Sequence, residues 1–149
     1  TAKAVKEGVV RVFGGDQYRP LLHVRDVGTA VTQVVGTNHR GVFNLHRDNL
    51  TISTLADRIE RFYLNTIVQK TDIKFEDARN YRVSSDKARD TFGFAPQFDI
   101  DVGIREVGAL VEQGRIRDPN DVQYSNFDYL RPIVVPMQSP LGGEIPIWR

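Results

Sequence analysis

Apolar and polar residues follow two periods along the chain, and the shorter period predicts strands around a glycine turn. Val9 to Phe13 has the composition of a short strand, and it stops at the turn Gly14-Gly15-Asp16. A second extended run, Leu21 to Val24, follows this turn. Pro20 favours extended backbone at Arg19. Two strands that meet at this turn would hold the guanidinium of Arg19 outward, where its planar fork suits a phosphate or carboxylate.

The longer period predicts amphipathic helices, of which the clearest is a valine stripe between Val24 and Val35 that ends at Gly36. One helix is expected before Gly8 and another at 86–92 after Ser84. A third follows a cap at Thr51 or Ser53, with Leu55, Ile59 and Phe62 on one face. The last runs from Asp99 to Gly114, with Ile100, Ile104, Val107 and Val111 on one face. These patterns predict an α/β chain of short strands and about four helices.

Two further strands and an irregular end complete the expected order. Gly41 to His46 is a short apolar run typical of a strand in a sheet, and 72–75 is another candidate. A charged loop with an embedded tyrosine covers 77–82. The last stretch holds four prolines, so we expect one domain at 1–131 and an extended arm at 132–149.

Composition excludes several classes of function. A length of 149 residues suits one domain with its own core, and a net charge of +1 provides no overall field that would recruit nucleic acid or an anionic membrane. The absence of cysteine excludes disulfides, thiolate nucleophiles and cysteine-based zinc sites, and the three histidines match no metal motif. No apolar run has the length of a membrane span and no signal peptide is present, so we expect a cytoplasmic protein. The first residue is not methionine, which indicates a trimmed or partial product.

Several motifs in order resemble one family. The first two motifs are Gly14-Gly-Asp-Gln-Tyr-Arg-Pro-Leu-Leu-His-Val-Arg-Asp-Val27 and Gly41-Val-Phe-Asn44. They resemble the C-terminal half of extended short-chain dehydrogenase/reductases, which are the NAD-dependent nucleotide-sugar epimerases and dehydratases. The later motifs agree in order and spacing: Thr51-Ile-Ser-Thr-Leu-Ala56, Tyr81-Arg-Val-Ser84 with Asp86-Lys87, Phe92-Gly-Phe-Ala-Pro96, Gly103-Ile-Arg-Glu106 and Tyr124-Ser-Asn126. Together these motifs are far more specific than any one of them, and they span roughly the first 130 residues.

The resemblance implies a nucleotide-sugar site in this half. Arg19 corresponds to the family's arginine against the pyrophosphate. A second basic residue comes from the loop before the Tyr-x-Val segment, where Arg79 fits best and Lys74 and Arg82 compete because the length of that loop varies. Val12 and Phe13 lie where the family shapes the pocket for the base. Two guanidiniums from separate loops suit a diphosphate, because each forms paired hydrogen bonds to its oxygens.

The family's catalytic and cofactor motifs are absent from this sequence. No Gly-x-x-Gly-x-x-Gly turn is present, and none of the five tyrosines is followed four places later by lysine. We therefore expect no catalytic residue, no metal and no dinucleotide on this chain, although NAD or NADP is implied for the full-length family. The implied fold is a small mixed α/β domain with about four helices and without a complete Rossmann sheet.

The same comparison predicts an uncovered surface. In the family the strand at 42–45 joins the sheet of the dinucleotide-binding half. We therefore expect this chain to be a homo-oligomer, to cover the surface with its C-terminal arm, or to bind a separate dinucleotide-binding chain.

Other polar and aromatic residues have ordinary structural interpretations. His23 lies in an apolar run and is expected to be packed instead of acting as a base, and Asp26 is expected to cap a helix. Asp48 and Asn49 are expected in a turn. Glu76 and Asp77 are not expected to act as an acid/base pair, because neighbours in a loop point apart. Trp148 is expected to pack on the body or on a partner.

Two functions remain open from the sequence. The first is the nucleotide-sugar-binding portion of an epimerase or dehydratase that is not competent alone. The second is a non-catalytic interaction or oligomerisation module that kept the fold and lost the ligand.

Overall fold

The computed structural model describes residues 1–71, 79–125 and 129. The chain forms two compact units, Thr1–Ile116 and Arg117–Arg149. The predicted strand at 72–75, Lys74, Glu76, Asp77 and the arm at 132–149 with Trp148 lie outside the described residues. The single element described in the second unit is a short 3-10 helix, Val122–Tyr124.

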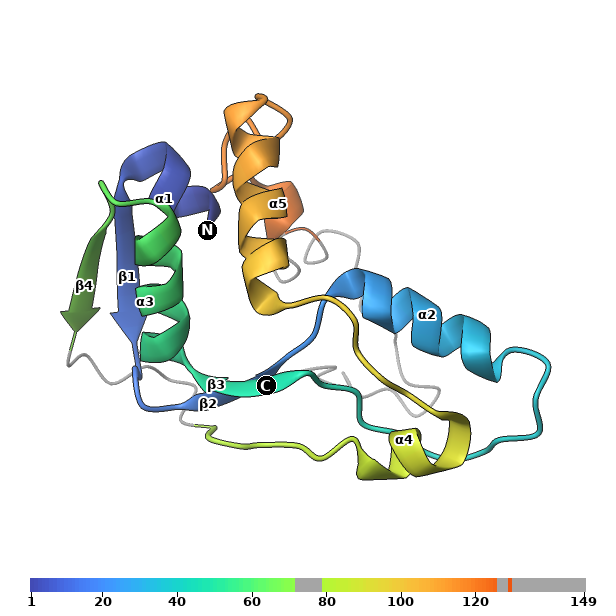
Figure 1. The fold of residues 1–149 in the computed structure, drawn as a ribbon. Coiled ribbons are helices and arrows are strands. Elements are labelled where there is room, and N and C mark those ends of the chain that lie inside the picture. Colours follow the sequence, from blue (N-terminus) through green and yellow to red (C-terminus); the bar gives the residue numbers. More distant parts are fainter. Residues whose placement is uncertain (72–78, 126–128, 130–149) are drawn as a thin grey trace, which may run out of the picture. The chain divides into compact units, whose positions relative to one another are not determined.

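The first unit is a mixed α/β fold, as the sequence predicts. Its elements in chain order are α1 (Ala2–Glu7), β1 (Val9–Phe13), β2 (Tyr18–Leu21), α2 (Val24–Val34), β3 (Asp48–Thr51), α3 (Ile52–Phe62), β4 (Ile67–Thr71), α4 (Asp86–Phe92) and α5 (Ile100–Glu112) (Figure 1). The described strands form two sheets of two strands, β1 parallel to β4 and β2 antiparallel to β3. No complete Rossmann sheet is present in the described part.

The larger core joins the first sheet to three helices. Ala4 of α1, Ile59 of α3, and Ile100 and Ile104 of α5 form a buried cluster, against which Leu55 packs. In Figure 1, α3 lies beside β1, with α1 and α5 close by. Burial of these apolar side chains stabilises the arrangement by roughly 1.5–3 kcal/mol for each large residue.

A second, smaller cluster holds α2 and α4 together. Ala30 of α2, Ala88 of α4 and the following Phe94 are buried there, and Phe43 and Leu45 pack against them from the connecting segment.

Most helix boundaries agree with the sequence prediction. The Thr51 side chain accepts a hydrogen bond from the N–H of Thr54, and that of Asp99 accepts one from the N–H of Asp101, so both are N-caps. α1 and α4 end at Gly8 and Gly93, and both glycines have left-handed backbone.

The two strands on either side of the glycine turn do not form a hairpin. β1 and β2 do not pair with each other, because β1 pairs with β4 and β2 with β3. The second strand is Tyr18–Leu21 instead of Leu21–Val24, since the His23 side chain accepts the N–H of Arg25 and begins α2. The turn itself is tight: Gly14 has positive φ, and a Cβ on Gly15 would overlap the Ser53 hydroxyl.

The predicted strand Gly41 to His46 is also wrong, because this segment pairs with no strand among the described residues. The strand in this region is β3, which begins at Asp48. Asp48 and Asn49 therefore lie in a strand and not in a turn, since the antiparallel partner β2 extends the backbone there.

α2 has the predicted period but the opposite orientation. Asp26 and Ala30 are its buried residues, whereas Val24, Val27, Val31 and Val35 are exposed. On α5, Val107 is likewise at the surface, and Gly108 is buried instead. Among the helices of the described ranges, none is both long enough and apolar enough to cross a membrane.

Candidate functional site

Arg19 lies in β2, and neutral acceptors fix its guanidinium. One of its terminal nitrogens donates to the carbonyl oxygens of Tyr18 at 2.9 Å and Arg79 at 2.6 Å. The other terminal nitrogen donates to the side-chain oxygen of Gln17 at 2.8 Å. The extended backbone before Pro20 orients the side chain, as the sequence predicts. These contacts bring Arg19 next to the backbone of Arg79, so two predicted site residues are neighbours.

The charge of Arg19 has no carboxylate partner within the described ranges. By contrast, Arg25 pairs with Glu106, Arg58 with Asp99 and Asp101, and Arg89 with Asp86. Because carbonyl and amide oxygens orient a guanidinium without neutralising it, Arg19 retains its positive charge for an anion.

Asparagine side chains hold the loop of Arg79 against β2. The Tyr18 N–H donates to the side-chain oxygen of Asn80 at 2.9 Å. Asn49 in β3 accepts the N–H of Val83 and donates to its carbonyl, both at 3.0 Å. Because the Asn49 side chain binds both the backbone N–H and the carbonyl of Val83, it fixes the position of the loop. The sequence shows no sign of this, because the partners are far apart along the chain.

Two tyrosines accompany the arginines. The guanidinium carbon of Arg82 lies 3.7 Å from the ring centre of Tyr18, and that of Arg19 lies 5.6 Å from the ring centre of Tyr81. Arg82, a competitor of Arg79 in the sequence prediction, therefore stacks on an aromatic face. Arg19, Arg79 and Arg82 provide positive charge here. Tyr81, which the sequence analysis placed in a motif but not in the site, adds an aromatic ring.

The two strand residues predicted for the base pocket differ in exposure. Val12 is 2% exposed and belongs to the core, whereas Phe13 at the end of β1 is half-buried. Of the two, Phe13 is the side chain with surface available to a ligand. Their roles stay predictions.

His23 is packed, as the sequence suggests. Its Nδ1 accepts the N–H of Arg25 at 3.2 Å, which leaves Nε2 to donate to Glu106 at 3.1 Å. The other carboxylate oxygen of Glu106 lies 2.7 Å from Arg25, and the imidazole ring contacts Phe98. The histidine is buried and engaged on both nitrogens, so it is a helix cap and not an available base.

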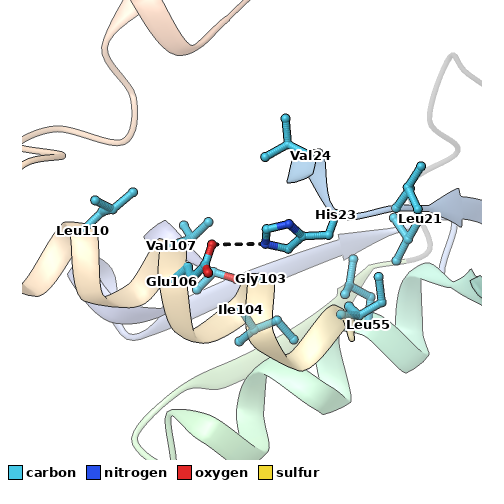
Figure 2. Close-up of a pocket in the computed structure, with 12 residues that line it drawn as sticks. Leu21, His23, Val24, Leu55, Gly103, Ile104, Glu106, Val107 and Leu110 are labelled. Atoms are coloured by element: carbon cyan, nitrogen blue, oxygen red, sulfur yellow. Dashed lines mark hydrogen bonds and ion pairs between the residues drawn. The ribbon is translucent and has the colours of Figure 1, made fainter. Parts of the chain in front are cut away.

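An open groove of about 420 Å³ borders this histidine. Figure 2 shows its lining from the end of β2, the start of α2, α3 and α5, with Leu21, Leu55, Ile104, Val107 and Leu110 around it. The His23–Glu106 hydrogen bond lies at its edge. Apart from this network the lining is largely apolar, so the groove accommodates apolar surface.

Asp26 is buried and serves a distant loop instead of its own helix. Its carboxylate accepts the N–H groups of Gln97 at 2.8 Å and Phe98 at 3.1 Å. The prediction that it caps α2 is therefore wrong, since His23 is the cap.

A second cavity of about 340 Å³ lies between the start and the end of α4. There His46 Nδ1 lies 2.6 Å from the Ser85 hydroxyl, which also accepts the backbone N–H of His46 at 2.8 Å. Hydrogen bonds from Ser84 and then Arg89 lower the pKa of Asp86. Arg89 is paired with the Asp86 carboxylate, so its charge is not available to a ligand in this cavity. The contact between Ser85 and His46 fixes a loop to α4.

No group of three or more potential metal ligands is found among the described side chains.

Comparison with known proteins identifies the fold. No protein-family model matches the sequence, and no curated protein matches it. Solved structures do match. L-threonine dehydrogenase from Phytophthora infestans has 15% identity and a TM-score of 0.65, with 74% of this chain and 39% of that chain covered.

Two further matches concern nucleotide sugars by name. TunA, an NAD-dependent NDP-hexosamine 5,6-dehydratase involved in tunicamycin biosynthesis, has 16% identity and a TM-score of 0.69, with 78% of this chain and 40% of that chain covered. MoeE5, solved with UDP-glucuronic acid and NAD, has 18% identity and a TM-score of 0.64, with 76% and 40% covered.

The described fold thus resembles part of the fold of these enzymes, as the motifs suggested. This chain spans about 40% of the length of the solved structures that it matches.

Proposed function

We propose that this chain is the nucleotide-sugar-binding portion of an epimerase- or dehydratase-like protein, located in the cytoplasm and not catalytically competent alone. In this proposal Arg19 and Arg79 bind the diphosphate, and Val12 and Phe13 with their strand shape the place of the base. The ligand class is a nucleoside-diphosphate sugar.

The observation that carries the proposal is the state of Arg19. Its guanidinium is oriented by three neutral acceptors beside the loop of Arg79 and faces no carboxylate within the described residues. A fixed, uncompensated cation favours a diphosphate, because little side-chain order remains to be lost on binding. The names of two fold neighbours, an NDP-hexosamine dehydratase and a UDP-glucuronic acid complex, agree with this ligand class.

Dinucleotide binding is not part of the proposal for this chain. The glycine turn after β1 leads into β2 and not into a helix, so it lacks the helix N-terminus that such a turn presents to a pyrophosphate. Among the described residues no helix N-terminus follows the glycine turn, and we assign no step to NAD or NADP.

Calorimetric titration with UDP-, GDP- and dTDP-sugars tests the proposal. We expect saturable binding of at least one of them, weakened about 10- to 100-fold by Arg19→Ala, since a charged hydrogen bond contributes about 1.5–3 kcal/mol. Arg61→Ala, an exposed arginine on α3, is the matched control and should bind normally. Urea unfolding of each variant verifies that the fold is retained. Absence of binding for every nucleotide sugar, or normal affinity of Arg19→Ala, contradicts the proposal.

The alternative is a non-catalytic interaction or oligomerisation module. It is favoured by the exposed valines of α2, which suit a protein contact more than a small ligand. Under this alternative the titrations are silent, while association of the chain persists.

A further inference from the structure

Two asparagine side chains attach the segment 79–83 to the antiparallel pair β2–β3. Asn80 accepts the backbone N–H of Tyr18 at 2.9 Å. Asn49 accepts the N–H of Val83 and donates to its carbonyl, both at 3.0 Å. In Figure 1 the yellow-green chain that leads into α4 runs along these two strands. The segment is therefore held near both of its ends.

The outer edge of β2, on the side away from β3, offers few groups for a backbone contact. Gln17 and Leu21 direct their carbonyls to the β3 side, where they accept backbone N–H groups at 3.1 and 2.8 Å. Since neighbouring residues of a strand direct their backbone groups to opposite sides, those of Tyr18 and Pro20 face the outer edge. Proline has no N–H, so Tyr18 is the residue of β2 whose N–H lies there, and Asn80 accepts it.

The same segment sets the direction of the Arg19 guanidinium. One terminal nitrogen donates its two hydrogens to the carbonyls of Tyr18 at 2.9 Å and Arg79 at 2.6 Å. The other terminal nitrogen donates one hydrogen to Gln17 at 2.8 Å. The remaining donors, Nε–H and one terminal N–H, have no partner among the described residues. These two groups are therefore the ones that an anion can contact.

Asn49 belongs to the same face of the two strands as the ring of Tyr18. It lies opposite Pro20, which is two residues from Tyr18 along β2. Alternate residues of a strand and cross-strand partners share a face, so all three side chains are on one side. The segment follows this face in order, because the guanidinium of Arg82 lies 3.7 Å from the ring centre of Tyr18 and Val83 binds Asn49.

We propose that Asn49 is the positioning residue of the Arg19 site. By holding Val83, it keeps the segment 79–83 in place and the Arg79 carbonyl against the guanidinium. The direction of the two remaining N–H groups then follows from the position of the segment. The ligand that meets these groups is the one of the proposed function, on which the inference rests, whereas the orientation of Arg19 is a property of the chain alone.

The chemistry of asparagine explains why this residue suits the role. Its amide has a donor and an acceptor, as a peptide group does, so Asn49 takes the place of a strand partner for Val83. Alanine would reach neither backbone group. Aspartate would keep the contact with the N–H and present a charged oxygen to the carbonyl. Because Asn49 is half-buried, water replaces it less readily than it would on an exposed surface.

NMR of the Arg19 guanidinium tests the positioning without a ligand, with the signals assigned by their loss in Arg19→Ala. When both hydrogens of one terminal nitrogen are bound, rotation of that group is slow, so its two protons should give separate signals in the wild type. Asn49→Ala should merge them. Asn49→Asp, which keeps the shape of the side chain, should do the same at neutral pH and serves if Asn49→Ala does not fold. Asn38→Ala, an exposed asparagine after α2, is the matched control.

Calorimetric titration with UDP-, GDP- and dTDP-sugars measures the consequence for binding. Asn49→Ala should weaken binding about 3- to 10-fold, because a long side chain must then be ordered when the ligand binds. In the Arg19→Ala background the same change should have little effect, since Asn49 acts through that arginine. A residue with a structural role alone would weaken binding equally in both backgrounds.

Two results overturn the proposal. One is a guanidinium whose signals stay separate in Asn49→Ala and Asn49→Asp, and the other is an equal loss of affinity in the two backgrounds. Urea unfolding verifies that each variant is folded under the conditions used. A wild type that binds no nucleotide sugar contradicts the proposed function, and the guanidinium signals then decide whether Asn49 positions Arg19.

Discussion

At the scale of single residues, Asp26 shows how one buried carboxylate joins distant parts of the chain. It is 2% exposed and accepts two backbone N–H groups from the segment that leads into α5. Asp26→Ala removes the charged acceptor of both backbone N–H groups, so we expect a loss of about 3 kcal/mol in the free energy of unfolding. Urea unfolding at neutral pH measures it.

Asp26→Asn is the conservative comparison, because it retains one oxygen acceptor and the volume of the side chain. It should lose less stability than Asp26→Ala. Equal stability of the wild type and Asp26→Ala would show that these hydrogen bonds contribute nothing.

Gly108 is a second residue whose identity the packing dictates. A Cβ at this position would collide with the hydroxyl of Tyr63, whose pKa is raised by burial and by the nearby Glu112. Gly108→Ala should therefore destabilise the protein by about 1–3 kcal/mol through overpacking. The double variant Gly108→Ala, Tyr63→Phe removes the colliding oxygen and should recover part of the loss.

Gly28 on α2 provides the opposite control for this experiment. Its hypothetical Cβ meets nothing within 4 Å, so Gly28→Ala should stabilise the helix by about 0.5–1 kcal/mol. Thermal unfolding of the variants compares the two glycines, and similar effects at both would refute the packing argument.

What the sequence reveals of single residues depends on how near their partners are. The packing of His23 was predictable because its apolar neighbours are adjacent in sequence. The caps at Thr51 and Asp99 were predictable because the N–H groups that donate to them lie within three residues. The partners of Asp26 and Asn49 are distant along the chain, so local pattern assigned both of them wrongly.

At the scale of elements, the start of α5 is an electrostatic junction. Asp99 caps the helix and lies 3.5 Å from Arg47 and 3.7 Å from Arg58. The hydrogen bond from the N–H of Asp101, and then these arginines, lower the pKa of Asp99 below its ordinary value. Ionised Asp99 is therefore favoured in the folded state over the unfolded state.

This shift predicts a loss of stability in acid. Because the pKa is lower in the folded state, the contribution of Asp99 is complete above the ordinary aspartate pKa of about 4 and disappears as the pH falls through the folded pKa. Asp99→Asn keeps a capping side chain but cannot titrate, so its urea midpoint should fall less steeply between about pH 4 and pH 2. An identical acid profile for both proteins would exclude this contribution.

The strand pattern was informative at 9–13 and misleading at 41–46 for one physical reason. β1 has β4 beside it, so its extended tendency is realised as pairing. Phe43 and Leu45 have the same tendency and a core face but no neighbouring strand among the described residues, so the segment stays unpaired. A sequence shows the tendency to pair, not the presence of a partner.

At the scale of the whole molecule, the mixed α/β class and its relation to part of a larger enzyme fold were predictable, since the motifs lie in order along the chain.

The lack of a dinucleotide motif gives a test on the entire chain. We expect no change in NADH fluorescence on addition of the protein, because β1 is followed by a strand and not by a phosphate-binding helix. The same protein sample should still give heat with a nucleotide sugar. Saturable enhancement of NADH emission would contradict the expectation.

The parallel pairing of β1 with β4 has a consequence for folding kinetics. Val9 pairs with Ile67, so the loop that must close contains the whole β2–β3 ribbon together with α2 and α3. Pairing over such a separation is slow, because chain entropy is lost before the contacts form. During synthesis β1 leaves the ribosome well before β4 exists, and until then it is an unpaired apolar strand that is prone to aggregate or to need a chaperone.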